Sequence, residues 1–294
     1  MNIRQHRLGA VALLTAVATA LVAAPTAQGA PRAPGETIAT VSRYVALGDS
    51  YSAAPLVPTL QIAGGCFRST NNYANVVSRA LPGDTFVDRT CSGADTADLT
   101  ASQLPGTPAQ LSAVTADTDL VTLGIGGNDE SVFGTLVGLC PSLRASDPTG
   151  APCRDLMRSD GQDRLLAAVA RTEDRIVEVV AAIEERAPRA RVMLVGYPQI
   201  APSQGTCPGL LPLADGDYHY ANQVNKRLTT AVRHAAARTH VDYVDVWQAS
   251  QGHDVCSADP WINGQVTDPT RALNYHPFAN EQAAVAALIL DQLG

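Results

Sequence analysis

The chain has 294 residues, of which 46% are hydrophobic, and a formal net charge of -7. This length suits one well-buried α/β domain, and no Pro/Ser-rich linker, repeat or charge block divides it. Nucleic-acid binding needs clustered positive charge, whereas the arginines here are scattered through an acidic chain. We therefore expect a single domain and no nucleic-acid partner.

The first thirty residues have the three-part layout of a secretory signal peptide. Arg4 and Arg7 precede an apolar run from Leu8 to Ala24, and small residues follow. The run is short for a membrane span and leads into Pro25 rather than a stop-transfer pattern, with a retained anchor as the alternative.

We expect a secreted, extracellular protein with no transmembrane segment. The predicted organisation is a signal peptide over residues 1–30, cleaved between 24 and 30, and one domain over 31–294. We expect this domain to act as a monomer.

Six cysteines follow the signal peptide, and an even number in an exported chain indicates disulfides. No Cys-x-x-Cys occurs and no other group of ligands is clustered, so we expect neither a metal nor a cofactor. Because each cysteine falls in a predicted loop, we favour pairing between neighbours over a buried unpaired set. The predicted bonds are Cys66–Cys91, Cys140–Cys153 and Cys207–Cys256.

Strand and helix patterns alternate along the mature chain. Short apolar runs predict strands at 44–47, 85–90, 119–125, 191–195 and 241–246, and helical periodicity predicts helices at 73–81, 162–186, 217–239 and from Pro277 onward. Residues 130–160 are predicted to be irregular. The alternation predicts an α/β fold: a three-layer α/β/α sandwich around a mostly parallel, five-stranded, flavodoxin-like sheet.

Polar or glycine residues follow three of these strands, where ligands bind in open α/β sheets. Ser50 follows the first strand, Gly93 the second and Asn128 the third. His276 follows the last strand and reaches the same edge. A serine hydroxyl needs a base to become a nucleophile, and backbone N–H groups with an amide side chain can hold an oxyanion.

These residues resemble the sequence blocks of the SGNH (GDSL) hydrolases, and most resemble the secreted bacterial GDSL lipases and esterases. The blocks are Gly48-Asp49-Ser50, Gly93, Gly126-Gly127-Asn128-Asp129 and His276-Pro277. The resemblance implies that Ser50 is the nucleophile and His276 the general base and acid. It also implies an oxyanion hole formed by the N–H groups of Ser50 and Gly93 and the side chain of Asn128.

The chain departs from the family at the residue that orients the histidine. The family usually has Asp three residues before it, where this chain has Leu273. Since some related esterases use a main-chain carbonyl, we expect the Leu273 carbonyl to accept the Nδ1–H of His276. Asp268 is the alternative.

Apolar loop residues favour fatty-acyl esters as substrates, whether simple esters, acylglycerols or phospholipids. Leu56 and Val57 on one side and Phe133 and Leu136 on the other are the expected walls of an acyl groove. The alternatives are an acetyl esterase that acts on carbohydrate or cell-wall polymers and a secreted binding domain without activity.

Overall fold

The central sheet contains the five strands that the sequence predicts, and all of them are parallel. Its order is β4-β1-β5-β6-β7, the flavodoxin-like order. The strands are β1 (Arg43–Gly48), β4 (Thr85–Asp88), β5 (Leu120–Gly124), β6 (Arg191–Val195) and β7 (Asp242–Val244). The computed structural model describes residues 41–81, 83 and 85–294, so the predicted signal peptide over 1–30 lies outside the described residues.

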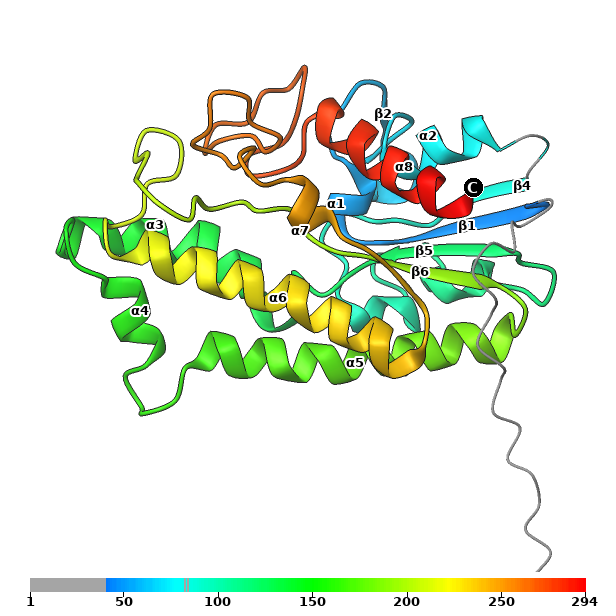
Figure 1. The fold of residues 1–294 in the computed structure, drawn as a ribbon, viewed down its shortest axis with the longest axis horizontal. Helices are drawn as coiled ribbons and strands as arrows, with labels where there is room; N and C mark the ends of the chain where they lie inside the picture. The colour runs from blue at the N-terminus through cyan, green and yellow to red at the C-terminus, as the bar shows by residue number, and fades with distance from the viewer. Residues whose placement is uncertain (1–40, 82, 84) are drawn as a thin grey trace, which may run out of the picture. The chain divides into compact units, whose positions relative to one another are not determined.

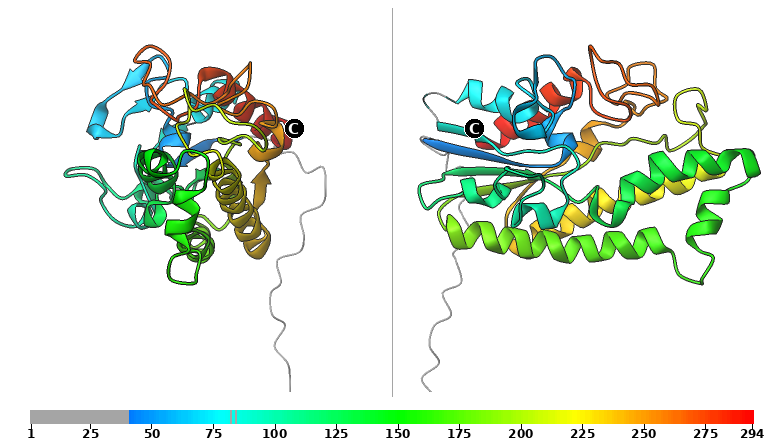
Figure 2. Two further views of the ribbon diagram at one scale, coloured as in Figure 1. Left: turned by 90° about the vertical axis from the view of Figure 1, so that its left-hand side faces the viewer. Right: turned by 180° about the vertical axis from the view of Figure 1, so that it is seen from behind.

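Helices cover both faces of the sheet, which gives three layers (Figure 1). On one face α2 (Tyr73–Ala80) packs against α8 (Ala279–Leu293), and on the other α5 (Arg164–Arg186) packs against α6 (Asp217–Thr239). Figure 2 shows the same layers from the side and from behind. The predicted three-layer α/β/α sandwich is confirmed.

The alternation of side chains along β1 explains why its sequence is a continuous apolar run. Tyr44 and Ala46 belong to the core beside α2 and α8, whereas Val45 and Leu47 belong to the core beside α5 and α6. Successive strand residues point to opposite faces, so a strand covered on both sides needs apolar residues at every position.

The segment 130–160, predicted to be irregular, instead forms a series of short helices. These are too short to produce a recognisable apolar period. The short elements of the chain are α1 (Ser50–Ala53), α3 (Cys140–Leu143), α4 (Pro152–Met157), α7 (Val246–Ala249), the π-helix η5 (Gly134–Leu139), and the 3₁₀ turns η1 (Ala63–Gly65), η2 (Thr96–Leu99), η3 (Gln110–Ala113), η4 (Asp129–Ser131) and η6 (Arg144–Ser146).

Two further features differ from the prediction. A small antiparallel hairpin of β2 (Leu60–Gln61) and β3 (Arg68–Ser69) was not predicted, because two-residue strands have no alternation to detect. The last helix starts at Ala279 rather than Pro277, since an isolated β-bridge pairs Pro277 with Ile262 and keeps it extended.

The three disulfides pair as predicted: Cys66–Cys91, Cys140–Cys153 and Cys207–Cys256. The first joins the β2–β3 hairpin to the loop that follows β4. The second closes the segment of short helices between β5 and α5. Bridges of this kind typically stabilise a fold by about 2–4 kcal/mol, mainly by restricting the unfolded chain.

Candidate active site

The turn that carries Ser50 is built where β1 ends. Asp49 caps the short helix α1, with its Oδ1 atom accepting a hydrogen bond from Tyr51 N (2.9 Å), and Asp49 N donates to Gly124 O on β5 (3.0 Å). Ser50 is therefore the first residue of a helix, where N–H groups have no acceptor within the helix. Its side chain lies at the carboxyl end of the sheet.

Gly48 lets β1 approach β5 closely just before this turn. Its φ of 141° lies outside the range that other residues favour, and a Cβ atom would lie 2.4 Å from Gly124 O and 2.5 Å from Ser52 Oγ. Both backbone groups of Gly48 also bond to the Gln110 side chain, at 2.8 and 3.0 Å. The backbone just before Ser50 is thus fixed by its close packing against β5 and by its hydrogen bonds to Gln110.

A buried carboxyl–phenol pair connects this turn to two other strand ends. The Tyr197 hydroxyl, just after β6, donates to Asp49 Oδ2 (2.5 Å) and accepts from Gly127 N (2.8 Å). Burial raises the pKa of Asp49 from 3.8 to about 7, although the bond from Tyr197 acts in the opposite direction. Sequence reasoning missed Tyr197, even though its place after a strand was a usable signal.

The loops that carry the predicted oxyanion groups Gly93 and Asn128 are joined by a hydrogen bond. Gly93 has a φ of 84°, so the chain turns directly after the disulfide-bonded Cys91. The Asn128 side chain spans to this turn, because its Nδ2 atom donates to Ala94 O at 2.8 Å. An amide nitrogen carries two hydrogens, which leaves a second one for another acceptor.

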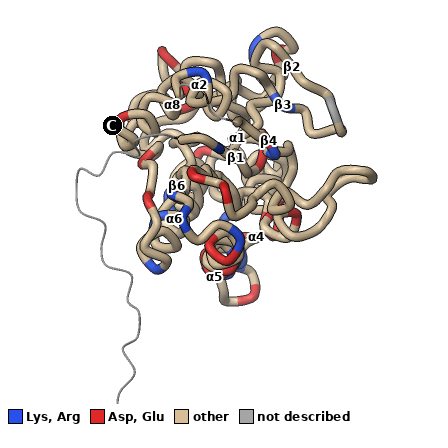
Figure 3. Tube along the Cα trace, turned by 90° about the vertical axis from the view of Figure 1, so that its right-hand side faces the viewer, with Lys and Arg blue, Asp and Glu red and all other residues tan. Residues whose placement is uncertain are grey.

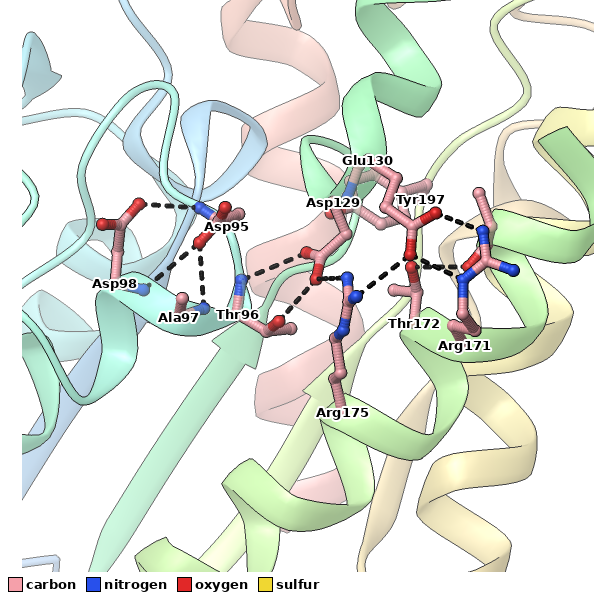
Figure 4. Close-up of polar contacts among 12 residues, drawn as sticks. Asp95, Thr96, Ala97, Asp98, Asp129, Glu130, Arg171, Thr172, Arg175 and Tyr197 are labelled. Carbon is pink, nitrogen blue, oxygen red and sulfur yellow. Dashed lines mark hydrogen bonds and ion pairs between the residues drawn. The ribbon is translucent and has the colours of Figure 1, made fainter. Parts of the chain in front are cut away.

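Asp129 fastens these two loops together beneath the surface (Figure 4). Its buried carboxylate accepts hydrogen bonds from Thr96 N (3.1 Å) and Thr96 Oγ1 (2.5 Å), and from Arg175 Nη1 on α5 (3.3 Å). The neighbouring Glu130 pairs with Arg171 and Arg175 of the same helix. Both acidic and basic residues lie on α5 (Figure 3).

His276, near the far end of the chain, packs against the turn that carries Ser50. Its ring centroid lies 5.6 Å from that of Tyr51, and the Tyr51 hydroxyl donates to Tyr275 O at 2.7 Å. The imidazole Nδ1 lies 2.7 Å from Asn274 O, which assigns the proton to Nδ1 and leaves Nε2 as the proton acceptor. Burial lowers the pKa of His276 from 6.5 to about 4, because no charged partner offsets the lost hydration.

The orienting group is a backbone carbonyl, but it belongs to Asn274 rather than to Leu273. Tyr275 has a φ of 58°, a left-handed turn that separates Asn274 from His276. The Leu273 carbonyl accepts His276 N instead (3.2 Å). The alternative Asp268 is half-buried, and its Oδ1 accepts hydrogen bonds from Thr270 N and Oγ1. Neither predicted group contacts Nδ1.

The expected acyl walls have different environments. Phe133 packs against the rings of Tyr51 (5.3 Å) and Tyr197 (5.0 Å), and with Leu136 it lines a narrow apolar cavity of about 10 Å³. Val57, on the other side, is fully buried in the core. An acyl chain could enter the cavity beside Phe133 only if its walls move apart.

Among residues 41–81, 83 and 85–294, no group of three or more His, Cys, Asp or Glu side chains is arranged to hold a metal ion. Within the same described part of the chain, no helix has the length and apolar character needed to cross a bilayer.

Comparison with known proteins agrees with this arrangement. Residues 46–280 match the model of the GDSL-like lipase/acylhydrolase family. Lipase 2 of Streptomyces coelicolor is 39% identical over 272 residues, with 89% of each chain covered. The extracellular lipase of Streptomyces rimosus superposes with a TM-score of 0.68 at 28% identity, covering 86% of this chain and all of that one. Phospholipase A1 of Streptomyces albidoflavus gives 0.66 at 26% identity, with the same coverage.

Proposed function

This chain belongs to the GDSL-like lipase/acylhydrolase family and is a carboxylic ester hydrolase, and from that premise we propose that it cleaves fatty-acyl esters through a Ser50–His276 dyad. The observation that carries the proposal is the docking of the His276 loop on the Ser50 turn. Tyr51 contacts both the His276 ring and the Tyr275 carbonyl, so base and nucleophile are held on one edge.

In the first half of the reaction, His276 Nε2 takes the proton of the Ser50 hydroxyl as its oxygen attacks the ester carbonyl carbon. The tetrahedral oxyanion is held by the N–H groups of Ser50 and Gly93 and by the free amide hydrogen of Asn128. When the intermediate collapses, protonated His276 gives its proton to the leaving alcohol. Water then attacks the acyl-enzyme, again with His276 as base.

The Asn274 carbonyl takes the role of the aspartate in a catalytic triad, with one difference. It fixes the tautomer by accepting the Nδ1–H, but as a neutral group it gives the imidazolium little electrostatic support. We propose that catalysis therefore depends strongly on the oxyanion hole. The hydrogen bonds of Asn128 to Ala94 and of Asp129 to Thr96 support this, because they fasten its two loops together.

We further propose that the mature protein is secreted as one domain over residues 31–294 and acts as a monomer. The signal-peptide pattern of residues 1–30 and the three disulfides favour export, since such bonds persist in oxidising environments. The S. rimosus relative is described as extracellular.

Labelling with a fluorophosphonate and hydrolysis of p-nitrophenyl esters from acetate to octanoate test this function. Ser50→Ala and His276→Ala should each lower kcat by roughly 10³-fold or more, and Ser50→Ala should abolish labelling. Ser159→Ala, at an exposed serine between α4 and α5, is the matched control and should behave as wild type. Activity on acetate alone, together with release of acetate from acetylated xylan, would instead support the polymer acetyl esterase.

A further inference from the structure

A second cavity of about 240 Å³ lies beside the β2–β3 hairpin, and neither Ser50 nor His276 lines it. We call it the hairpin cavity and define it by Arg68 of β3, Arg89 after β4, and Gln103 in the loop beyond. The hairpin and this loop are in contact, since a Cβ atom on Gly65 would lie 3.1 Å from Leu104 Cδ1.

The polar groups of the hairpin cavity are incompletely paired. Arg68 Nη1 donates to Asp88 O (2.6 Å) and Thr90 O (3.2 Å), which fixes its guanidinium, while no described residue accepts from its buried Nε. Within the described part of the chain, the Arg89 guanidinium has no hydrogen-bond or ion-pair partner. Gln103 Oε1 is likewise buried without a described donor.

The balance of charge at the hairpin cavity is positive, in contrast to the acidic chain as a whole. Its lining contains two arginines against one carboxylate, Asp98, and that carboxylate already accepts a hydrogen bond from Asp95 N (3.0 Å). Two guanidinium groups offer planar forks of N–H donors, the arrangement that suits an anion with several oxygens.

Exposed apolar side chains flank, in sequence, the residues that line the hairpin cavity. Ile62 is 67% and Phe67 48% exposed, and both lie in the turn between β2 and β3 that also supplies the lining residue Cys66. Phe67 has a φ of 49°, a conformation uncommon for an aromatic residue. The exposed apolar side chains suit the acyl chains of an amphiphile, and the cationic cavity suits its anionic head group.

We propose that the hairpin cavity is a second lipid site that binds the phosphate of a glycerophospholipid head group between Arg68 and Arg89. Ile62 and Phe67 contact the acyl chains of the surrounding lipid surface. Phosphate is favoured over carboxylate because its additional oxygens can accept from both guanidinium forks at once. The site attaches the protein to phospholipid surfaces without contacting the ester that is cleaved.

The hairpin cavity is joined to the loop that carries Gly93. The Cys66–Cys91 disulfide crosses between them, Ser92 N donates to Cys66 O (2.9 Å), and Ser92 Oγ donates to Phe67 O (3.2 Å). Gln103 Nε2 also donates to Ser92 O at 2.9 Å. A bound head group would therefore steady the residue that precedes Gly93.

Sedimentation with phosphatidylcholine vesicles, in a Ser50→Ala background that prevents hydrolysis, tests the site. Arg89→Gln removes the unpaired charge and should weaken vesicle binding by roughly tenfold or more, as expected for one charge-assisted contact. Ile62→Ser should also weaken it. The matched controls Arg227→Gln, at an exposed arginine on α6, and Val266→Ser, at a 73% exposed position, should bind as before.

Competition identifies the head group. Monomeric short-chain phosphatidylcholine should displace the protein from vesicles, whereas decanoate at equal concentration should not. Unchanged vesicle binding by Arg89→Gln, or displacement by decanoate alone, overturns the proposal. Hydrolysis of p-nitrophenyl butyrate by Arg89→Gln with Ser50 intact, together with its melting temperature, is measured separately. Because that assay needs no lipid surface, it separates failure of this site from failure of the Ser50–His276 dyad.

Discussion

The partly buried position of His276 predicts that this esterase stays active at unusually low pH. The proposed general base must be neutral to accept a proton, and burial lowers the pKa of His276 from 6.5 to about 4. At pH 5 about 90% of the imidazole is then neutral, against about 3% for an ordinary histidine. We therefore expect kcat/KM at pH 5 to remain close to its plateau and the acid limb to lie near pH 4.

The assay is the pH dependence of kcat/KM on a soluble ester, combined with NMR titration of the His276 ring. Asp49 needs a control, because its pKa is raised to about 7 by burial and its protonation would disturb the bond from Tyr197. Asp49→Asn separates the two groups. An acid limb near 7 that disappears in this variant belongs to Asp49.

An acid limb between pH 6 and 7 that persists in Asp49→Asn, with a ring titration at the same pH, would refute the reasoning. It would mean that His276 is better hydrated, or better supported by charge, than its packing against Tyr51 indicates. Stability gives a second check. The unfolded chain binds a proton at His276 below about 6.5 and the folded chain only below about 4, so His276 contributes a loss of stability as pH drops through this window. Because Asp49 and Glu281 act in the opposite direction, this contribution is read as the difference in pH dependence between wild type and His276→Gln.

Three further outcomes follow from the contacts. Asp268→Ala should keep kcat/KM within about twofold of wild type, because its carboxylate bonds only within its own turn. Thr96→Val should lower kcat up to about tenfold with little change in KM, since it removes a hydrogen bond to Asp129 and touches no substrate; Thr270→Val is the control. Burial raises the pKa of Glu281 from 4.5 to about 8, so this group contributes a loss of stability as pH rises between these values, and thermal melts of Glu281→Gln should lack that contribution relative to wild type.

The layers and strand order of the fold were predictable because each central strand is covered on both faces. A strand such as β1 must then be apolar at every position, and its pattern stands out from the amphipathic helices. The hairpin of β2 and β3 and the short helices of 130–160 were not predictable. Elements of two to six residues complete no period, and the disulfides Cys66–Cys91 and Cys140–Cys153 link them to residues 25 and 13 positions away along the chain.

The candidate site also has a part that the sequence could predict and a part that it could not. Ser50, Gly93 and Asn128 could be placed because each follows a parallel strand, and the carboxyl ends of such strands share an edge. This rule could not predict the hydrogen bonds that hold the loops of these residues in place, because the bonded residues are far apart in the sequence. The bond from Thr96 to Asp129 crosses 33 positions, and that from Tyr197 to Asp49 crosses 148.

The partner of His276 shows most clearly why a sequence can predict the type of group but not the residue. The absence of an acid three positions before the histidine correctly favoured a carbonyl, since a neutral acceptor is always present in the backbone. Which carbonyl faces Nδ1 depends on one dihedral angle, the φ of 58° at Tyr275. That angle lies next to the bond between the Tyr51 hydroxyl and the Tyr275 carbonyl. The Ser50 turn thus helps to hold the loop geometry that sets the orientation of His276.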